Sequence, residues 1–191
     1  MNKLPHEFHA DLTEERIKAV GHVIHHARNG CLEHHDEIAG DTNWSYGCRA
    51  RDWTRQALRN AAAKTKEYPF LSILEDSGQK FVIGIAGIPV KFFKDDAEEP
   101  NARVRKHSAS ELSQLSLFHF NGVDAPEDVA WRFVVEINTL DLEVIKVVFV
   151  GLDQHEDTLC YYNVPLQDNV AKIYDIASTH EEGVELAAPM V

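Results

Sequence analysis

The period of the hydrophobic pattern changes once along this chain, near residue 70, and this change constrains the fold more than any other feature. Before it, apolar residues recur every three to four positions, as they do on the buried stripe of a helix. After it, they alternate with polar residues, as they do on a half-buried strand. Helices followed by a run of strands, without βαβ alternation, predict an α+β fold with an antiparallel sheet.

Two helices are predicted before this change. Thr13 is a suitable N-cap for the first, and Asn29-Gly30 is expected to end it. Residues 31–47 are rich in His, Asp, Gly and Asn and indicate a loop. The second helix is predicted from about residue 48 to residue 67, because Tyr68-Pro69 disfavours its continuation.

About six strands are predicted, over residues 70–75, 80–86, 90–94, 131–137, 144–152 and 159–164. Two further helices are predicted, a short one over 110–117 and an amphipathic one that ends near residue 177. The expected architecture is an antiparallel sheet with two N-terminal helices and one C-terminal helix packed on it. Residues 1–177 are expected to form a single α+β domain, followed by an acidic flexible tail over 178–191.

Charge is distributed unevenly along the chain. The formal net charge is −12, yet residues 49–106 hold twelve basic side chains against eight acidic ones. A basic segment in an acidic protein is where an anionic partner would be expected to dock. The overall acidity argues against a protein that coats nucleic acid or binds a membrane surface.

Arginines at i, i+4 and i+8 predict one exposed basic flank on the second helix, with a basic loop beyond the third strand. Arg forks and aromatic rings near a helix start are suited to binding phosphate or acidic groups. The alternative is a solvated face whose arginines pair with the protein's own carboxylates. The candidate binding residues are Tyr46, Arg49, Arg51, Trp53, Arg55, Arg59, Arg103, Arg105 and Lys106.

Histidines suggest a second candidate site. His22 and His26 are four apart on the first helix, a spacing that allows two imidazoles to share one metal ion. With Cys31 and His34 they form a candidate zinc set, and no other cofactor is expected. The motif HExxH does not occur, and the alternative is a group of exposed histidines that titrate near pH 6.5.

Carboxylates suggest a third candidate. Glu75 and Asp76 end one predicted strand, Glu136 lies on another, and Lys91 lies nearby. A metal-dependent nuclease or hydrolase would place such groups around Mg²⁺, but the required Glu-x-Lys pair is missing. The alternative is that these acids lie in turns or in ion pairs. The nucleophile elbow GxSxG and the phosphate loop GxxxxGK[ST] are also missing.

These observations favour a non-enzymatic binding or regulatory protein that holds an acidic partner through the basic helix and loop. A protein partner is expected first and nucleic acid second, in a setting such as a toxin–antitoxin or phage-defence system. The alternative is a metal-dependent hydrolase or nuclease, and a third hypothesis is a structural subunit that forms a homodimer. A cytoplasmic location is predicted, because the three cysteines cannot all form disulfides and the sequence shows no signal peptide or membrane span.

Overall fold

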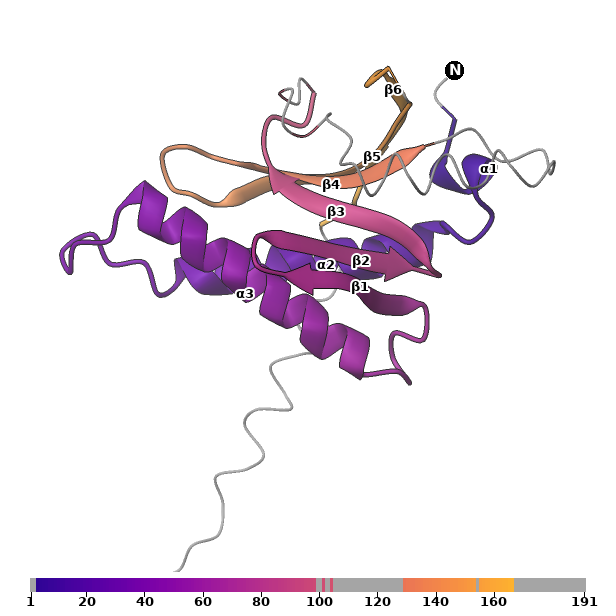
Figure 1. Ribbon diagram of the computed structural model, residues 1–191. Helices are drawn as coiled ribbons and strands as arrows, with labels where there is room; N and C mark the ends of the chain where they lie inside the picture. Colours follow the sequence, from indigo (N-terminus) through magenta and orange to yellow (C-terminus); the bar gives the residue numbers. More distant parts are fainter. Residues whose placement is uncertain (1–2, 99–100, 102–103, 105–128, 154, 167–191) are drawn as a thin grey trace, which may run out of the picture.

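The computed structural model describes residues 3–98, 101, 104, 129–153 and 155–166 (Figure 1). Its helices are α1 (Pro5–Phe8), α2 (Glu14–Leu32) and α3 (Asn43–Ala63). Its strands are β1 (Leu71–Ser77), β2 (Lys80–Ile85), β3 (Ile88–Lys94), β4 (Ala130–Ile137), β5 (Val144–Leu152) and β6 (Thr158–Asn163). Helices followed by a six-stranded sheet confirm the predicted α+β class.

The sheet has the strand order β1-β2-β3-β4-β5-β6 and is mixed, so the prediction of an antiparallel sheet was wrong in one respect. β3 and β4 run parallel, with Val90 opposite Trp131, whereas all other neighbours are antiparallel. Alternating hydrophobicity does not reveal strand direction. The segment between Lys94 and Ala130 is longer than the roughly dozen residues that a parallel crossover needs.

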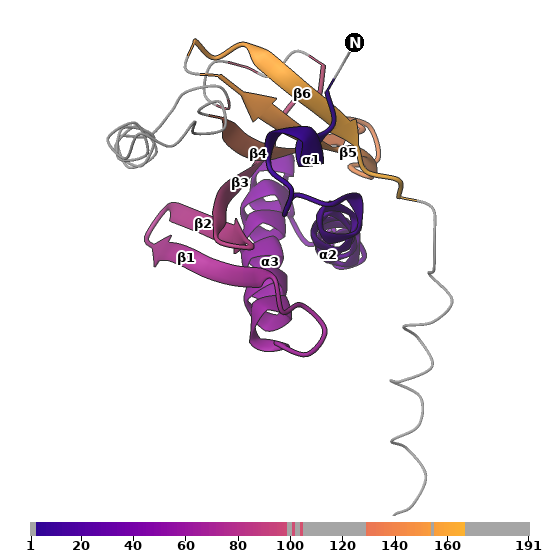
Figure 2. The ribbon, with the colours of Figure 1, turned by 90° about the vertical axis from the view of Figure 1, so that its right-hand side faces the viewer.

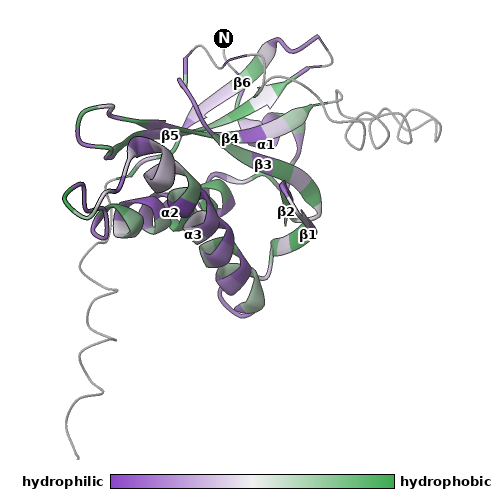
Figure 3. Cartoon of the chain, turned by 60° about the vertical axis from the view of Figure 1, so that its left-hand side comes forward, coloured by the Kyte–Doolittle hydropathy of each residue, from purple (hydrophilic) through white to green (hydrophobic). Residues whose placement is uncertain are grey.

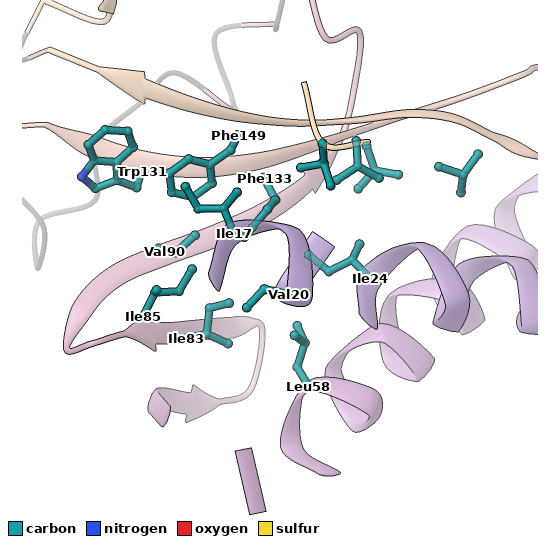
Figure 4. Packing of buried hydrophobic residues seen from close by; sticks show 14 of the residues in the cluster. Ile17, Val20, Ile24, Leu58, Ile83, Ile85, Val90, Trp131, Phe133 and Phe149 are labelled. Atoms are coloured by element: carbon teal, nitrogen blue, oxygen red, sulfur yellow. The ribbon is translucent and has the colours of Figure 1, made fainter. Parts of the chain in front are cut away.

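The sheet curves around α2 and α3, which lie on its concave side (Figure 2). The main core lies between the sheet and these helices, where Ile17, Val20 and Ile24 of α2 belong to the same buried cluster as Phe133 and Phe149 of the sheet (Figure 4). On the other side of the sheet, Ala97 and Val104 pack with three valines of β4 and β5 in a second buried cluster. β5 is therefore covered on both sides, as its nearly continuous apolar sequence predicts.

The bounds of both long helices differ from the prediction: α2 extends past Asn29-Gly30 to Leu32, whereas α3 begins before residue 48 and ends at Ala63 rather than at residue 67. α2 continues through Asn29 because this side chain is engaged elsewhere: its Oδ1 accepts a hydrogen bond from Val144 N at 3.4 Å. α3 begins earlier because Thr42 and Ser45 form a capping box, in which each side-chain oxygen accepts from the other's backbone N–H. Figure 3 shows hydrophilic and hydrophobic residues on different parts of α3, as in an amphipathic helix.

The segment around β6 is held against the N-terminal helices. Gly21 of α2 allows this approach, since a Cβ there would lie 2.8 Å from Val164 Cγ1. His22 Nε2 lies 2.7 Å from the carbonyl oxygen of Pro165, and Tyr162 donates a hydrogen bond to Glu14 at 3.2 Å. Contacts between residues far apart in the sequence therefore hold β6 and the residues after it against α2.

Several predictions fall outside the described residues. They are the helix over 110–117, the C-terminal helix ending near 177, the tail over 178–191 and the basic loop residues Arg103, Arg105 and Lys106. Among the described residues, no helix has both the length and the apolar character needed to cross a bilayer.

Candidate anion-binding pocket

The arginine flank of α3 holds the hairpin formed by β1 and β2. Arg55 Nη2 lies 2.7 Å from Asp76 Oδ1, and Arg59 Nε lies 2.6 Å from Asp76 Oδ2. Arg55 also donates to the carbonyl of Gly78 at 3.0 Å, and Arg51 donates to the carbonyl of Gln79. Three turns of α3 are therefore bound to the tip of this hairpin.

The electrostatics of this contact are strong. Hydrogen bonds from Arg59 and Arg55 lower the pKa of Asp76 to about 2, and the bond to Asp76 raises the pKa of Arg59. Both guanidinium groups also lie over the ring of Phe81, at 5.2 and 5.7 Å from its centroid. This part of the flank thus contacts groups of its own chain, as the alternative interpretation of the charge pattern expects.

The remaining described candidates of the flank also have internal contacts. Arg49 binds Asp41 at 2.9 Å, and its hydrogen bonds lower the pKa of Asp41 to about 2. Tyr46 is buried and its hydroxyl donates to the carbonyl of Leu142 at 3.3 Å. Trp53 packs edge to face against His34, with ring centroids 5.2 Å apart. These residues support the α2–α3 corner.

Strands β2 and β3 separate from each other next to this hairpin. Pairing between β2 and β3 ends at Ile83 and Val90, so Phe81 and Phe92 are not ladder partners although their rings lie 6.0 Å apart. A pocket of about 480 Å³ lies in this region, lined by the β1–β2 hairpin, the C-terminal half of β3, the first half of α3, and Arg28 of α2. The docking of the hairpin on α3 thus creates one wall of the pocket.

Positive charge predominates in the lining of the pocket. Among the described residues, its acidic side chains are Glu75 and Asp95. Glu75 lies 3.7 Å from Lys80, and Asp95 accepts backbone hydrogen bonds at 2.9 and 3.1 Å. The basic side chains in the lining are Arg28, Arg51, Lys80, Lys91 and Lys94. The described part of the lining therefore has a surplus of basic groups.

Arg28 is the most unusual of these groups. It is only 2% exposed, and its Nε is buried without a hydrogen-bond partner. Among the described residues, no carboxylate or carbonyl accepts a hydrogen bond from its guanidinium group. Burial lowers the pKa of Arg28, since desolvation disfavours the charged form. A buried charge without a counter-charge lowers the folding stability by roughly several kcal/mol unless a ligand supplies the counter-charge.

Lys94 brings a second cation to the same region. It follows Val90 and Phe92 at alternate positions of β3, so it lies on the sheet face that packs against the helices. The side chain of Lys94 is exposed, yet partial desolvation lowers its pKa, and the nearby charge of Arg28 lowers it further. Two cations that repel each other, with no acid between them in the described residues, form a site suited to an anion.

The sequence contains a signal for both residues that the charge pattern alone did not reveal. Arg28 lies four residues after Ile24 and three before Cys31, at the spacing of the buried stripe of α2. Lys94 falls on the same side of β3 as Val90 and Phe92 by a period of two, but at the end of the strand, where its side chain is exposed. A charged residue at a core position is the pattern that could have identified the pocket.

The candidate zinc residues do not form one group. His22 contacts the Pro165 carbonyl, and its ring centroid lies 6.5 Å from that of His26. Cys31 is buried, while His34 lies against Trp53 beyond the end of α2. Within the described ranges, no three His, Cys, Asp or Glu side chains are close enough to hold a metal ion.

The carboxylates of the hydrolase hypothesis have other contacts. Both oxygens of Asp76 accept hydrogen bonds from Arg55 and Arg59, and Glu75 lies beside Lys80. Arg132, on the strand that carries Glu136, is buried on the second side of the sheet and donates to the carbonyls of Val104 and Trp131. These contacts favour structural roles for Glu75 and Asp76.

The histidines of α2 make stability depend on pH. Burial lowers the pKa of His25 and of His26, and the neighbouring imidazoles lower it further. The unfolded chain therefore binds more protons than the folded one, so stability is fully present above about pH 7 and falls as the pH drops through about 6.5. Urea titrations between pH 7.5 and 5.5 should show this fall.

The variant His25→Gln should show a smaller fall over this interval, whereas His6→Gln, at an exposed position, should behave like the unchanged protein. Asp41 and Asp76, with pKa values of about 2, lose their contribution only in a more acidic range. An equal slope for His25→Gln and the unchanged protein would contradict the role of this histidine.

Comparisons of this chain with models of protein families, with curated proteins and with solved structures find no match. The residues of the pocket are therefore the guide to its function.

Proposed function

We propose that this is a non-enzymatic binding protein that holds an acidic group of its partner in the pocket between the β1–β2 hairpin, α3 and β3. The observation that carries the proposal is Arg28, a buried guanidinium without an acidic partner in the described residues. Natural proteins seldom retain an uncompensated buried charge, and such groups concentrate at functional sites.

The chemistry of the lining supports recognition rather than catalysis. Guanidinium and ammonium groups bind carboxylate and phosphate oxygens through short, charge-assisted hydrogen bonds. The carboxylates in the described lining, Glu75 and Asp95, are already engaged by Lys80 and by backbone N–H groups. Anion binding is thus the property that the pocket's groups support best.

The expected partner presents one acidic group rather than a long polyanion. The chain's net charge of −12 repels nucleic acid at long range, and the arginines that could track a phosphate backbone bind Asp76 and Asp41 instead. A protein or a small molecule with a single anionic group fits these constraints.

Thermal unfolding with increasing inorganic phosphate or citrate, at constant ionic strength, tests the proposal. The unchanged protein should be stabilised, by about 2.7 kcal/mol when the anion reaches roughly 100 times its dissociation constant. For a chain of this size, such a gain corresponds to a rise in Tm of roughly 5–10 °C. The variant Arg28→Met should lose most of this response, because its pocket lacks the central cation.

Arg16→Met is the matched control. Arg16 lies on the same helix, pairs with Asp11 at 2.8 Å and does not line the pocket. This variant should respond to the anion like the unchanged protein. Equal responses of Arg28→Met and Arg16→Met, or no response of the unchanged protein to either anion, would refute the proposal. Loss of the response in Arg49→Met alone would assign binding to the arginine flank.

A further inference from the structure

We infer that the ligand of this pocket is a phosphate monoester whose organic part is an apolar ring. The inference rests on the proposed function and adds the chemical class of the ligand. Three features of the pocket support it: the number of uncompensated cations, the rings in the lining, and the size of the cavity.

The two cations indicate that the ligand carries more than one negative charge. Arg28 and Lys94 come from different elements, α2 and β3, and neither is paired with an acid in the described residues. A carboxylate carries one negative charge, whereas a phosphate monoester carries about 1.5 to 2 at pH 7. The guanidinium fork of Arg28 can bind two phosphate oxygens, which leaves the third for the ammonium group of Lys94.

The phenylalanine rings in the lining indicate that the ligand has an apolar part next to its phosphate. Phe81, Phe92 and Phe93 belong to the lining, and Phe92 lies two residues before Lys94 on the same face of β3. Phe81 and Phe92 meet edge to face at 6.0 Å, an arrangement in which they offer an apolar surface beside the cations. A ligand with an aromatic ring would bury its ring against them.

The size of the cavity excludes a bare phosphate as the complete occupant. Its volume of about 480 Å³ lies within the range of roughly 300–1,000 Å³ that is typical of small-molecule sites. A free phosphate ion would contact the cations but leave the half-buried rings of Phe92 and Phe93 partly in contact with water. A ring-bearing monoester would use both parts of the lining.

Calorimetric titration with three probes separates these features. Phenyl phosphate has the ring and the full charge, phenyl sulfate has the same shape with one charge at most, and inorganic phosphate lacks the ring. Phenyl phosphate should bind the unchanged protein about tenfold more tightly than phenyl sulfate, because its second negative charge strengthens its attraction to the two cations. It should also bind about tenfold more tightly than inorganic phosphate, because ring burial is lost.

Two variants assign these differences to residues. Lys94→Met should bring the affinities for phenyl phosphate and phenyl sulfate within about twofold of each other, because the cation that senses the second charge is gone. Phe92→Leu should weaken phenyl phosphate severalfold and leave inorganic phosphate unchanged. Thermal unfolding of each variant establishes that it is folded before titration.

Each failure has a separate meaning. Equal affinity of the unchanged protein for phenyl sulfate and phenyl phosphate would overturn the requirement for a dianion, and equal affinity for inorganic phosphate would overturn the requirement for a ring. If citrate stabilises the protein through Arg28 but phenyl phosphate does not bind, the ligand class is wrong and the proposed function stands. If no anion gives an Arg28-dependent response, both are wrong.

Discussion

Replacement of Arg28 by methionine is expected to raise the free energy of unfolding by about 1–4 kcal/mol in a buffer free of multivalent anions. The side chain is almost fully buried, and burial lowers its pKa. Methionine has a similar length and carries no charge, so it fills the same space without the desolvation penalty. Few substitutions of a buried arginine in a folded domain are expected to stabilise it.

Urea titrations of the unchanged protein, Arg28→Met and Arg16→Met measure this effect. Arg16→Met removes an exposed pair with Asp11 and should change the free energy of unfolding by less than about 1 kcal/mol. A loss of stability in Arg28→Met would mean that the guanidinium group has a stabilising counter-charge within the chain. Addition of phosphate should reduce the difference between the two proteins, because only the unchanged protein binds it.

Replacement of Phe149 by alanine is expected to lower the free energy of unfolding by about 3–5 kcal/mol. Phe149 is fully buried in β5, its ring stacks on Trp131 at 5.1 Å and it lies 4.8 Å from the ring of Phe133. Removal of the ring leaves a cavity at the centre of the aromatic cluster, where the large neighbours cannot collapse to fill it.

Ile145→Ala is the matched control on the same strand. Ile145 is 56% exposed, so its truncation should change stability by only about 0.5 kcal/mol. The comparison of midpoints in urea, at unchanged slope, separates a cavity effect from a change in the unfolded state. Similar losses for the two variants would show that Phe149 is not part of the core.

The strands were predictable because their sequences alternate according to burial. In β4, Trp131, Phe133 and Val135 belong to the main core, while Val134 belongs to the second cluster, as alternation requires. The parallel pairing of β3 and β4 was not predictable in this way. A strand presents the same alternation in both directions, and the direction depends on the path of the connecting segment.

The predicted helix boundaries were wrong for a different reason. Asn29-Gly30 is a frequent stop signal, but a tertiary hydrogen bond between Asn29 and Val144 occupies the side chain. The capping box of Thr42 and Ser45 was present in the sequence and was obscured by the polar composition around it. Local signals compete with tertiary contacts, and either can decide where a helix ends.

The pocket required the tertiary structure. The charge pattern identified the arginines of α3, yet the residues that lack acidic partners lie on α2 and β3. Pairing of Arg55 and Arg59 with Asp76 depends on the hairpin folding back onto α3, which no local spacing encodes. The useful signal was a single arginine at a core position of an otherwise apolar stripe.

The close approach of Gly21 to Val164 bears on the order in which the nascent chain can mature. During translation α2 emerges early, but the surface around Gly21 can be covered only after residue 164 has left the ribosome. Until then the helix has an uncovered face, and chaperones bind such surfaces while synthesis continues. Emergence of Val164, rather than formation of α2, should therefore set the time at which this region becomes resistant to proteases.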